Sequence, residues 1–561
     1  ANCTDVRVHG LDLRGAAVPL QGAFLVNTSV SGVALNGNMT GMRAFGTEGL
    51  EVRDSSIRGG LGCLEVEYSF WVRVVNNTFD GCDRGVSMTD TWESQVAGNR
   101  VGAEAVSGIS LSNSGHVRVA SNTMMRGGLA IEGQAKGFYT TIDVAPDNTV
   151  GGLPLAFHRN ETGLRVAGAT VGQFIAVNCT GLQAEGVSAV GGTPGGLVAY
   201  SDGARLTGSR FVNSTSEGLR VVYSEGVVLE DVAASGNGRA GDPPYSFGIG
   251  LHVLRSSVAV EGGEFSDNTG AGIRADDSAD LGINGSLVAR NGGYGVEVNG
   301  VSGAASLEGV VVRENTFGIR LNVGSGAVAR VGNSTVSANA EGGADARGDG
   351  ELVVRDSAFT GNGGPGLASR VGRILIEGNR FVGNEVGLAV TWHSTRYEGN
   401  VSNNVFDENA LGARIVQSAL VRVFHNQFLR NEVQALTDAG TTRWDAGYPA
   451  GGNFWSDYNG TDRCTSDTQD ICPIPDGLGD APREVPLDPD YAPGLPVRDR
   501  YPLMEPAVRS SAQPPSEATP RDVPELLEFL TTLPGALLVL LALPAAGAAV
   551  VWVRQRRRGP A

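Results

Sequence analysis

One pattern of hydrophobic and polar positions returns many times between about residue 75 and residue 440. Each copy holds an aromatic or aliphatic residue, then Asn, then Gly, and then a run of β-branched or aliphatic residues, as in Phe265–Ile273 and Phe381–Leu388. The pattern predicts short strands separated by tight turns. Glycines at equivalent places are 21 to 25 residues apart: Gly248, Gly272, Gly295, Gly318, Gly343, Gly366, Gly387 and Gly412.

A unit of this length cannot bury its own apolar face, so successive units must stack on one another. Leucine-rich repeats share the length but need a leucine frame that is absent here, and helical repeats are longer. The sequence therefore predicts an all-β fold over residues 1–440, a right-handed parallel β-helix with three short strands per turn. About twenty turns, spaced about 4.8 Å apart, would form a rod about 95 Å long. Gly236–Ser246 is predicted to be a loop inserted into one turn.

The repeat also assigns a place to each residue type. Val, Ile, Leu and Phe are expected to point inward and to stack on their copies in neighbouring turns. Gly supplies positive φ at the corners. Asn tolerates the same conformation and can hydrogen-bond to its copy one turn away, which predicts asparagine ladders.

The end of the chain predicts a membrane anchor. Residues 529–553 carry no charge, which exceeds the length of about 20 residues that crosses a bilayer. Arg554 and Arg556–Arg558 follow, so the C-terminus is expected inside the cell and the ectodomain outside. We predict a C-terminal transmembrane α-helix within 525–553, a cytoplasmic basic tail at 554–561 and a Pro/Ser-rich linker at 505–524. Residues 441–504 are predicted to form a C-terminal capping region.

Charge and cysteine content agree with a protein outside the cell. The net charge of −17 and the pI of about 4.9 exclude a nucleic-acid partner, which would require clustered cations. The spacing of Cys63 from Cys82 is close to one turn, and Cys464 and Cys472 can close a short loop, so both pairs are predicted to be disulfides. Cys3 and Cys179 have no evident partner. The start at Ala1, without an apolar leader, is interpreted as a mature chain whose signal peptide has been removed.

Eleven Asn-X-Ser/Thr sequons are candidates for N-linked glycans. Some are expected to occur by chance in a chain rich in Asn. The asparagines are Asn2, Asn27, Asn38, Asn76, Asn160, Asn178, Asn213, Asn284, Asn333, Asn400 and Asn459.

Three blocks after the last repeat carry a family resemblance. They are Gly451–Asp462 (GGNFWSDYNGTD), Asp476–Pro482 (DGLGDAP) and Asp499–Leu503 (DRYPL). Together with the Asn/Gly repeats, the blocks resemble the NosD-like, "periplasmic copper-binding" class of β-helix repeat proteins, which is common among archaeal surface proteins. The segment Cys464–Cys472 interrupts the usual Asp/Gly run. The resemblance implies the fold and an extracytoplasmic location, and little about function.

Within this C-terminal region, aromatic and acidic residues suggest two roles. Phe454, Trp455 and Tyr458 are expected to cover the open end of the β-helix. Clustered carboxylates suit Ca²⁺, whereas Asp in turns also binds local amides. The candidate Ca²⁺ ligands are Asp457, Asp462, Asp476 and Asp480. Copper, suggested by the family label, would need a cluster of His, Met or Cys, but the six histidines are scattered.

Carbohydrate cleavage is the sharpest enzymatic hypothesis. The tetrapeptides Tyr200–Gly203 and Tyr223–Gly226 are 23 residues apart, which should place Asp202 and Glu225 one turn apart, about 5 Å. Retaining glycosidases hold two carboxylates at about that separation. The alternative is a solvated polar ladder, continued by Arg255, Asp276 or Asp277, Asn299, Asn322, Arg370 and His393.

Three functions remain open from the sequence. The favoured hypothesis is a non-enzymatic, glycosylated, membrane-anchored surface protein with a role in the cell envelope or in a membrane assembly. The second is a carbohydrate-binding surface protein that uses a polar β-face. The third is a polysaccharide hydrolase or lyase, with Asp202 and Glu225 as its catalytic candidates. The expected partners are the membrane and other envelope proteins or surface glycans. A flat face free of sequons would favour the first two, because attached glycans would block contact.

Overall fold

The computed structural model describes residues 3–239, 248–391, 398–418, 420–438, 442–491 and 494–506. The chain divides into two compact units, 1–515 and 516–561. The predicted transmembrane helix within 525–553, the basic tail at 554–561 and the linker from residue 507 onward lie outside the described residues. In the described part of the chain, no helix is long and apolar enough to span a bilayer.

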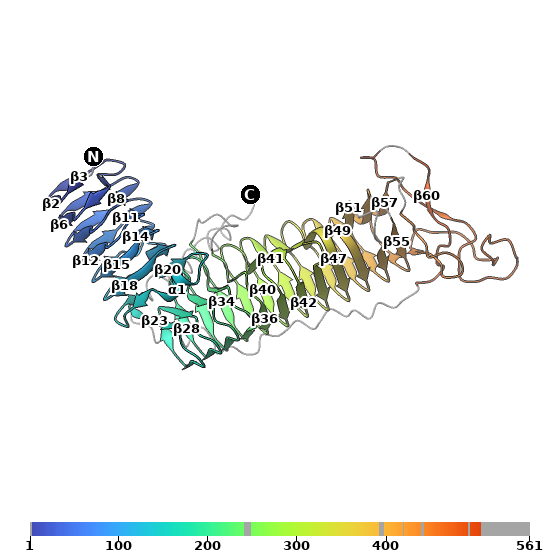
Figure 1. Ribbon diagram of the computed structural model, residues 1–561. Coiled ribbons are helices and arrows are strands. Elements are labelled where there is room, and N and C mark those ends of the chain that lie inside the picture. The colour runs from blue at the N-terminus through green and yellow to red at the C-terminus, as the bar shows by residue number, and fades with distance from the viewer. Residues whose placement is uncertain are drawn as a thin grey trace, which may run out of the picture. The chain divides into compact units, whose positions relative to one another are not determined.

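The first 150 residues form a stack of parallel coils, called here the first stack (Figure 1). A two-strand pair, β1 (Cys3–Thr4) and β5 (Leu25–Val26), lies beside its first turns. One sheet contains β2 (Arg7–His9), β6 (Ser29–Ser31), β9 (Glu51–Arg53), β12 (Arg73–Val75), β15 (Trp92–Ala97), β18 (Gly115–Ala120) and β21 (Asp143–Val144). The next contains β3 (Asp12–Arg14), β7 (Ala34–Asn36), β10 (Ser56–Arg58), β13 (Thr78–Asp80), β16 (Arg100–Val101), β19 (Thr123–Met124) and β22 (Thr149–Val150). The last contains β4 (Leu20–Ala23), β8 (Thr40–Phe45), β11 (Gly62–Glu67), β14 (Arg84–Thr89), β17 (Ser107–Ser112) and β20 (Leu129–Glu132).

A second stack begins at residue 153, and its three sheets are named here sheets I, II and III. Sheet I contains β23 (Leu153–Arg159), β26 (Gln173–Val177), β29 (Gly196–Ala199), β32 (Leu219–Val222), β35 (Leu251–Leu254), β38 (Ile273–Asp276), β41 (Tyr294–Val301), β44 (Phe317–Val323), β47 (Ala344–Arg355), β49 (Pro365–Glu377), β51 (Val386–Thr391), β54 (Leu411–Val416) and β57 (Val433–Thr437). Sheet II contains β24 (Arg165–Ala167), β27 (Gln183–Glu185), β30 (Arg205–Thr207), β33 (Val227–Glu230), β36 (Val258–Glu261), β39 (Leu281–Asn284), β42 (Ala304–Glu308), β45 (Val328–Gly332), β52 (Gly399–Ser402) and β55 (Val421–Phe424), and the long strands β47 and β49 run on into it. Sheet III contains β25 (Thr170–Val171), β28 (Ser188–Val190), β31 (Arg210–Val212), β34 (Ala233–Ser235), β37 (Glu264–Ser266), β40 (Leu287–Ala289), β43 (Val311–Arg313), β46 (Thr335–Ser337), β48 (Ala358–Thr360), β50 (Arg380–Val382), β53 (Val405–Asp407), β56 (Gln427–Phe428) and β58 (Phe454–Trp455).

The predicted parallel β-helix is thus confirmed, with about 19 turns. Buried and outward positions alternate along its strands, because successive side chains of a strand point to opposite faces. Inside, identical residue types stack from turn to turn. The rings of Phe359, Phe381, Phe406 and Phe428 are parallel, with centroids 4.8 to 5.1 Å apart.

Buried asparagines form the predicted ladders. In the second stack, the side-chain oxygen of each Asn accepts hydrogen bonds from the backbone and side-chain amides of its copy one turn earlier, as Asn339 does from Asn315. The side-chain amide of each rung also donates to a backbone carbonyl, which for Asn339 belongs to Val312. This ladder contains Asn237, Asn268, Asn291, Asn315, Asn339, Asn362, Asn384, Asn409 and Asn431.

The sequence had predicted continuous stacking over residues 1–440. Within the described residues the stacking is instead interrupted once. After β20 the chain forms the short helix α1 (Gly137–Thr140), and β23 then pairs antiparallel with β22 before a new parallel stack starts. The outward side chains of β26, β29 and β32 pack on the first stack, and they are Ile175, Val177, Leu197, Ala199 and Val222. We call this contact the seam.

Polar groups fix the register of the seam. Gln173 is fully buried, and its side-chain amide donates to the carbonyls of Leu129 and Pro194, each at 2.8 Å. Its side-chain oxygen accepts the Leu129 amide, also at 2.8 Å. Tyr139 of α1 is buried as well, with its ring 5.4 Å from that of Tyr200 in the β29–β30 connection, and burial raises the pKa of its hydroxyl to about 12. Both stacks are therefore held together by hydrogen bonds as well as by apolar contact.

The two disulfides are present as predicted. Cys63 and Cys82 join adjacent turns of the first stack, with Cα atoms 5.7 Å apart, and Cys464 pairs with Cys472 after the last turn. Cys179 is a buried thiol inside the second stack. Oxidised cysteines are typical of proteins outside the cytosol.

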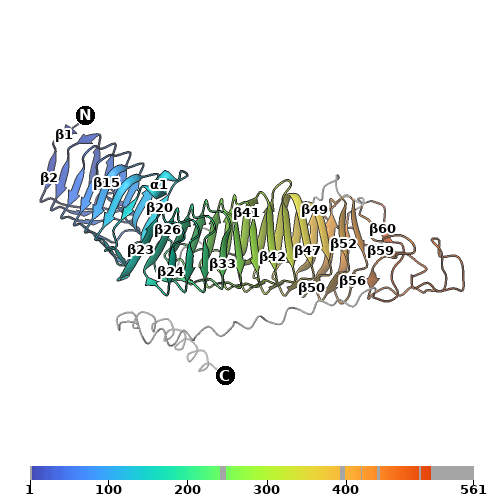
Figure 2. The ribbon, with the colours of Figure 1, turned by 60° about the horizontal axis from the view of Figure 1, so that its bottom comes forward.

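The end of the second stack is covered by aromatic residues. Trp455 stacks on Phe428, with ring centroids 4.3 Å apart, and Trp444 is buried beside both rings. Beyond them lies an antiparallel pair, β59 (Arg483–Val485) and β60 (Val497–Asp499) (Figure 2). Asp499 ends one asparagine ladder, since its Oδ2 accepts hydrogen bonds from the Asn453 amide at 2.7 Å and the Trp455 indole at 2.9 Å.

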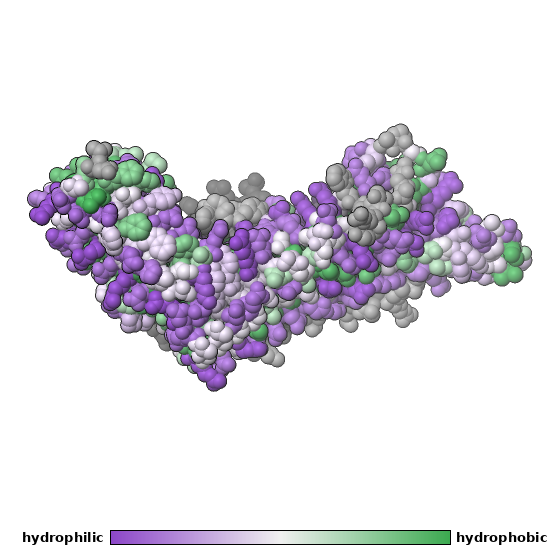
Figure 3. Space-filling view, in the orientation of Figure 1, coloured by the Kyte–Doolittle hydropathy of each residue, from purple (hydrophilic) through white to green (hydrophobic). Residues whose placement is uncertain are grey.

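Large apolar side chains are exposed on the first turns, where Figure 3 shows a hydrophobic area. Exposed apolar residues mark a contact surface only where they are contiguous, and these residues are divided among the three corners of the first turns. They are Leu11, Phe24, Met39, Leu61, Tyr68, Phe70 and Trp71.

Candidate functional site

The outward face of sheet I carries two columns of polar side chains, although outward positions at its start are apolar. The pairing register places each residue beside its equivalent in the next turn, about 4.8 Å away. The first column runs through Arg220, His252, Arg274, Glu297, Arg320 and Asp345. The second runs through Asp276, Asn299, Asn322, Arg347 and Arg370. We call this surface the polar face.

The two columns are linked by hydrogen bonds and ion pairs. Arg274 donates to Asp276 at 2.8 Å and lies 3.8 Å from Glu297. In the second column, Asn299 donates to Asp276 at 3.0 Å, and Asn322 donates to Asn299 at 2.8 Å. These contacts restrain the side chains. Their remaining polar atoms are available to hydrogen-bond to a ligand on the face.

His252 is the most constrained group on this face. Its Nδ1 lies 3.3 Å from a carboxylate oxygen of Glu217, and its Nε2 lies 3.0 Å from one of Asp276. Ionised carboxylates only accept hydrogen bonds, so both ring nitrogens donate and the imidazole is positively charged. Burial works against this charge, but the hydrogen bonds to Asp276 and Glu217 raise the pKa of His252 above its usual value. No ring nitrogen is left to act as a general base.

The pKa values of the two carboxylates shift in the opposite direction, downward. Burial acts to raise the pKa of Glu217, but the hydrogen bond from His252 and the charge of Arg220 hold it well below its usual range. The pKa of Asp276 is also lowered, against burial, by His252, Asn299 and Arg274. The cluster therefore pairs a protonated His252 with two ionised carboxylates.

An aromatic pair borders the polar face. The rings of Tyr294 and Phe317 lie parallel, with centroids 5.0 Å apart, at the starts of β41 and β44. The Arg320 guanidinium lies 5.3 Å from the Tyr294 ring centroid and donates to its hydroxyl at 2.9 Å. The face thus combines charged groups, amides and a flat apolar surface.

The ten described sequon asparagines are all exposed or partly exposed. Their places in the fold leave one surface free. None lies on the described strands of sheet I between Leu219 and Thr391. Asn284, Asn333 and Asn400 lie on or directly after strands of sheet II, and Asn213 follows β31 of sheet III. Glycans at these positions would leave the polar face uncovered.

A cavity of about 280 Å³ opens where the polar face meets the seam. The first stack contributes Arg84 and Glu132, and the second contributes Glu217 and Arg220. Arg220 and Glu132 lie 3.6 Å apart across the seam. The cavity therefore has charged groups from both stacks.

The predicted catalytic pair lies elsewhere. Asp202 and Glu225 occupy successive turns between sheets I and II, and Asp202 accepts the backbone amide of Glu225 at 2.9 Å. Both residues are exposed. The two tyrosines that precede them stack as expected, with Tyr200 and Tyr223 centroids 4.8 Å apart. This geometry matches a solvated ladder, while the catalytic role of the pair stays untested.

The ladder predicted to continue from this pair is divided between two places. Arg255 and Asp277 follow Tyr223 at the corner, each with positive φ. Asp276, Asn299, Asn322 and Arg370, by contrast, lie on the polar face. His393 lies outside the described residues.

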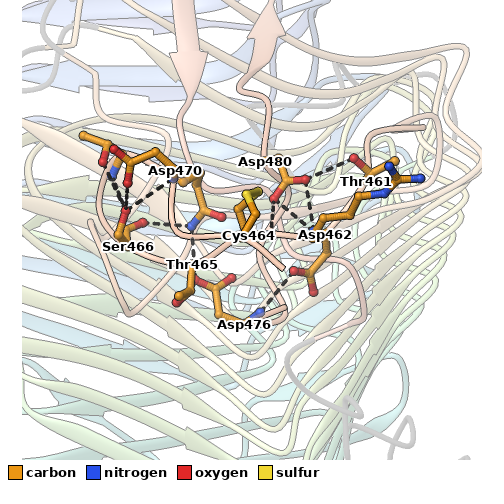
Figure 4. The surroundings of a disulfide bond; sticks show 12 residues. Thr461, Asp462, Cys464, Thr465, Ser466, Asp470, Asp476 and Asp480 are labelled. Atoms are coloured by element: carbon orange, nitrogen blue, oxygen red, sulfur yellow. Dashed lines mark hydrogen bonds between the residues drawn. A yellow bond between two sulfur atoms is a disulfide. The ribbon is translucent and has the colours of Figure 1, made fainter. Parts of the chain in front are cut away.

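The candidate Ca²⁺ ligands near the Cys464–Cys472 disulfide bind protein groups (Figure 4). Asp480 accepts the amides of Arg463 and Cys464, at 3.0 to 3.1 Å. Asp462 accepts two further amides, which belong to Asp476 and Gly477. Asp457 pairs with Arg483 at 2.7 Å instead. These contacts match Asp in turns, and Ca²⁺ binding stays a prediction.

The described residues do not fit a copper site. No group of three His, Cys, Asp or Glu side chains within them is placed to hold a metal ion. The histidine with the most partners, His252, has both ring nitrogens engaged by carboxylates. The function proposed below therefore assigns no role to copper.

The sequence alone does not bring the residues around His252 together. Most equivalent residues are 21 to 25 positions apart, but Arg220 and His252 are 32 positions apart, because a segment is inserted after β34. In the sequence, His252 is therefore one of several scattered histidines. The inserted segment itself is recognisable, so aligning the strands on both sides of it would have revealed the pair.

Comparisons with known proteins agree with the division of the chain into a first and a second stack. Residues 162–326 and 294–448 match the family model of the right-handed β-helix region, and residues 19–142 match that of the periplasmic copper-binding protein NosD. The chain matches no curated protein. The matched ranges end and begin on either side of the seam.

Several solved structures are similar at low identity. The periplasmic alginate epimerase AlgG is 12% identical over 61% of this chain and 74% of its own, with a TM-score of 0.22. The A-module of the mannuronan C-5 epimerase AlgE6 of Azotobacter vinelandii is 13% identical over 79% and 92%, with a TM-score of 0.22. A tailspike of the Pseudomonas phage phi297 is 10% identical over 86% and 64%, with a TM-score of 0.15. With TM-scores this low, these similarities have no bearing on function.

Proposed function

Because the chain belongs to the right-handed β-helix family, whose fold hosts enzymes and binding proteins alike, we propose its function from the site itself: it binds an extended polysaccharide along the polar face. The observation that carries the proposal is the pair of polar columns on sheet I, free of sequons between Leu219 and Thr391. A chain of sugar rings presents hydroxyl groups at regular intervals, and the columns present donors and acceptors at regular intervals of about 4.8 Å.

The chemistry of the columns supports a polyhydroxylated ligand. Amides such as Asn299 and Asn322 both donate and accept, and guanidinium groups such as Arg274 donate in several directions. The parallel rings of Tyr294 and Phe317 offer an apolar surface for the faces of sugar rings. A protein partner would instead favour a larger apolar centre on this face.

Binding without cleavage is part of the proposal. His252 lies at one end of the face, but its two nitrogens are occupied by Glu217 and Asp276. The carboxylates are in turn held ionised, so neither is poised to donate a proton at neutral pH.

The cell surface is the proposed location. Two disulfides support an oxidising compartment. We assign N-linked glycans to the exposed sequons of the first stack and of sheets II and III, and a membrane anchor to residues 525–553. An envelope or assembly role is consistent with this placement, since the polysaccharide would then be a component of the same surface.

The test is affinity electrophoresis of the full chain in gels that contain polygalacturonate, hyaluronan or dextran. At least one polymer should retard the wild-type protein, and the double variant Arg274→Ala/Asn322→Ala should reduce the retardation at least fivefold. Arg330→Ala, which removes an exposed arginine from β45 of sheet II, is the matched control and should migrate as wild type. Retardation by none of the polymers, or equal retardation of the double variant, would refute the proposal.

A further inference from the structure

The seam cavity contains a buried cation whose hydrogen-bonding capacity is not filled. The Nε atom of Arg220 is buried and has no hydrogen-bond partner among the described residues. The nearest carboxylate across the seam, Glu132, lies 3.6 Å from its Nη1 and is half exposed. A buried guanidinium with unmet donors is costly unless an acceptor reaches it.

The second nearby carboxylate is already engaged. Glu217 accepts a hydrogen bond from the Ser216 hydroxyl at 2.7 Å and lies 3.3 Å from the charged imidazole of His252. The hydrogen bond from His252 and the charge of Arg220 offset part of its negative charge. Arg220 lines the cavity and interacts with Glu217 by charge, but among the described residues it makes no hydrogen bond to a carboxylate, and Glu132 lies 3.6 Å away.

The rest of the lining fits a small ring-shaped ligand. Arg84, from the first stack, lies on the cavity wall and has only a 3.6 Å contact with Glu65 as an ion pair among the described residues. Ser107 and Ser110 supply hydroxyl groups on the same wall, and Ile131 and Pro194 supply apolar surface. At about 280 Å³ the cavity is at the small end of the range for ligand sites, which suits one sugar unit and not an oligomer.

We infer that the seam cavity binds a single sugar unit that carries an oxyanion, a carboxylate or a phosphate, with Arg220 and Arg84 as its charge partners. The inference rests on the proposed function, because the cavity opens at the end of the polar face and would hold the terminal unit of the bound polysaccharide. It adds a ligand class and an orientation, since the acidic end of the glycan lies at the seam.

Isothermal titration of the full chain with three monosaccharides tests the inference. D-glucuronate and glucose 6-phosphate carry the two oxyanions, and glucose is the neutral control. At least one acid should bind, and glucose should bind at least tenfold more weakly, which is the factor expected for one hydrogen-bonded charge pair. The acid that binds more tightly identifies the oxyanion. Equal binding of glucose, or no binding of either acid, overturns the inference.

Variants assign the site. Arg220→Gln should weaken binding of the acid at least tenfold, and Arg84→Gln should weaken it several-fold. Arg73→Gln, an exposed arginine of the first stack away from the cavity, should leave it unchanged. Circular dichroism would reveal whether Arg220→Gln disturbs the seam. In that case the milder variant Arg84→Gln is the test, and an unchanged affinity of Arg84→Gln for the acid overturns the inference.

The outcome separates this inference from the proposed function. Polymer retardation that depends on Arg274 and Asn322, with no monosaccharide binding, overturns the cavity site and leaves the polar face as a binding surface. If the acid binds in a manner that depends on Arg84 but no polymer retards the protein, the cavity site is supported and polysaccharide binding along the polar face is refuted.

Discussion

Replacing one rung of the long asparagine ladder, Asn339→Ala, should destabilise the second stack by about 3 to 5 kcal/mol. The Asn339 side chain accepts the backbone and side-chain amides of Asn315, both at 3.1 Å. It donates to the Val312 carbonyl at 3.2 Å and to the Asn362 side chain at 3.0 Å. Alanine removes all four hydrogen bonds and leaves buried partners without replacements.

The magnitude follows from those four contacts. A hydrogen bond contributes about 1 kcal/mol net, and a buried group left without a partner costs about 1 to 3 kcal/mol. The loss is reduced because Asn362 Oδ1 still accepts the Asn339 backbone amide at 3.2 Å. The Asn315 side-chain amide likewise keeps its bond to the Val288 carbonyl. The expected destabilisation is therefore closer to the sum for four lost hydrogen bonds than to the sum for four buried groups left without partners.

Hydrogen–deuterium exchange with mass spectrometry is the appropriate assay. Each turn contacts only its neighbours, so the damage should be greatest in peptides that cover residues 312–362 and should decline toward both ends of the stack. Arg330, on β45 of the same turn, is exposed, and Arg330→Ala should leave exchange unchanged. A loss of less than about 1 kcal/mol, or a uniform loss along the stack, would refute the view that the ladder holds adjacent turns together.

Two pH effects should be measurable by the same method. The pKa of His252 is raised on folding, so the stability that its contacts with Glu217 and Asp276 contribute is complete below about pH 6.5 and is lost as pH rises through the folded value. Protection of β32 and β35 should therefore fall above neutral pH, and His252→Gln should abolish the dependence; an unchanged profile would contradict this. Burial and the charge of Asp445 raise the pKa of Asp499 from 3.8 to about 7, against hydrogen bonds from Trp455 and neighbouring amides. Stability of the cap should decline by about 4 kcal/mol between pH 4 and pH 7, and Asp499→Asn should remove that slope; equal protection of residues 453–458 at pH 5 and pH 8 would contradict it.

The sequence predicted those parts of the fold that repeat. A rung such as Asn315 and a glycine such as Gly318 return at nearly constant spacing, and each copy meets the next one at the same place. The corner role predicted for these repeated glycines is wrong from Gly272 to Gly412: they lack positive φ, and a Cβ at Gly318 would meet the backbone of the next turn. The Cys63–Cys82 disulfide was predictable for the same reason, since its spacing is close to one turn. Local pattern is sufficient wherever a residue's neighbours are its own copies.

The seam could not be predicted in that way. It depends on contacts between unlike residues that are far apart in sequence, such as Gln173 with Leu129 and Thr215 with the Val106 carbonyl. Outward apolar residues of β26, such as Ile175, look like ordinary strand residues until the first stack covers them. The candidate site was hidden for a related reason, because the inserted segment separates Arg220 from His252 in sequence and not in space.

The long ladder has a consequence for how such a protein changes size. Each coil is joined to the next by the same amide contacts, so a duplication or deletion of one whole coil would leave every remaining joint with a matching neighbour. The extent of sheet I, and with it the number of sugar units that could lie along it, is then set by how many coils the gene encodes. Adding or removing whole coils would therefore fit such a protein to longer or shorter glycans without any new type of side-chain contact.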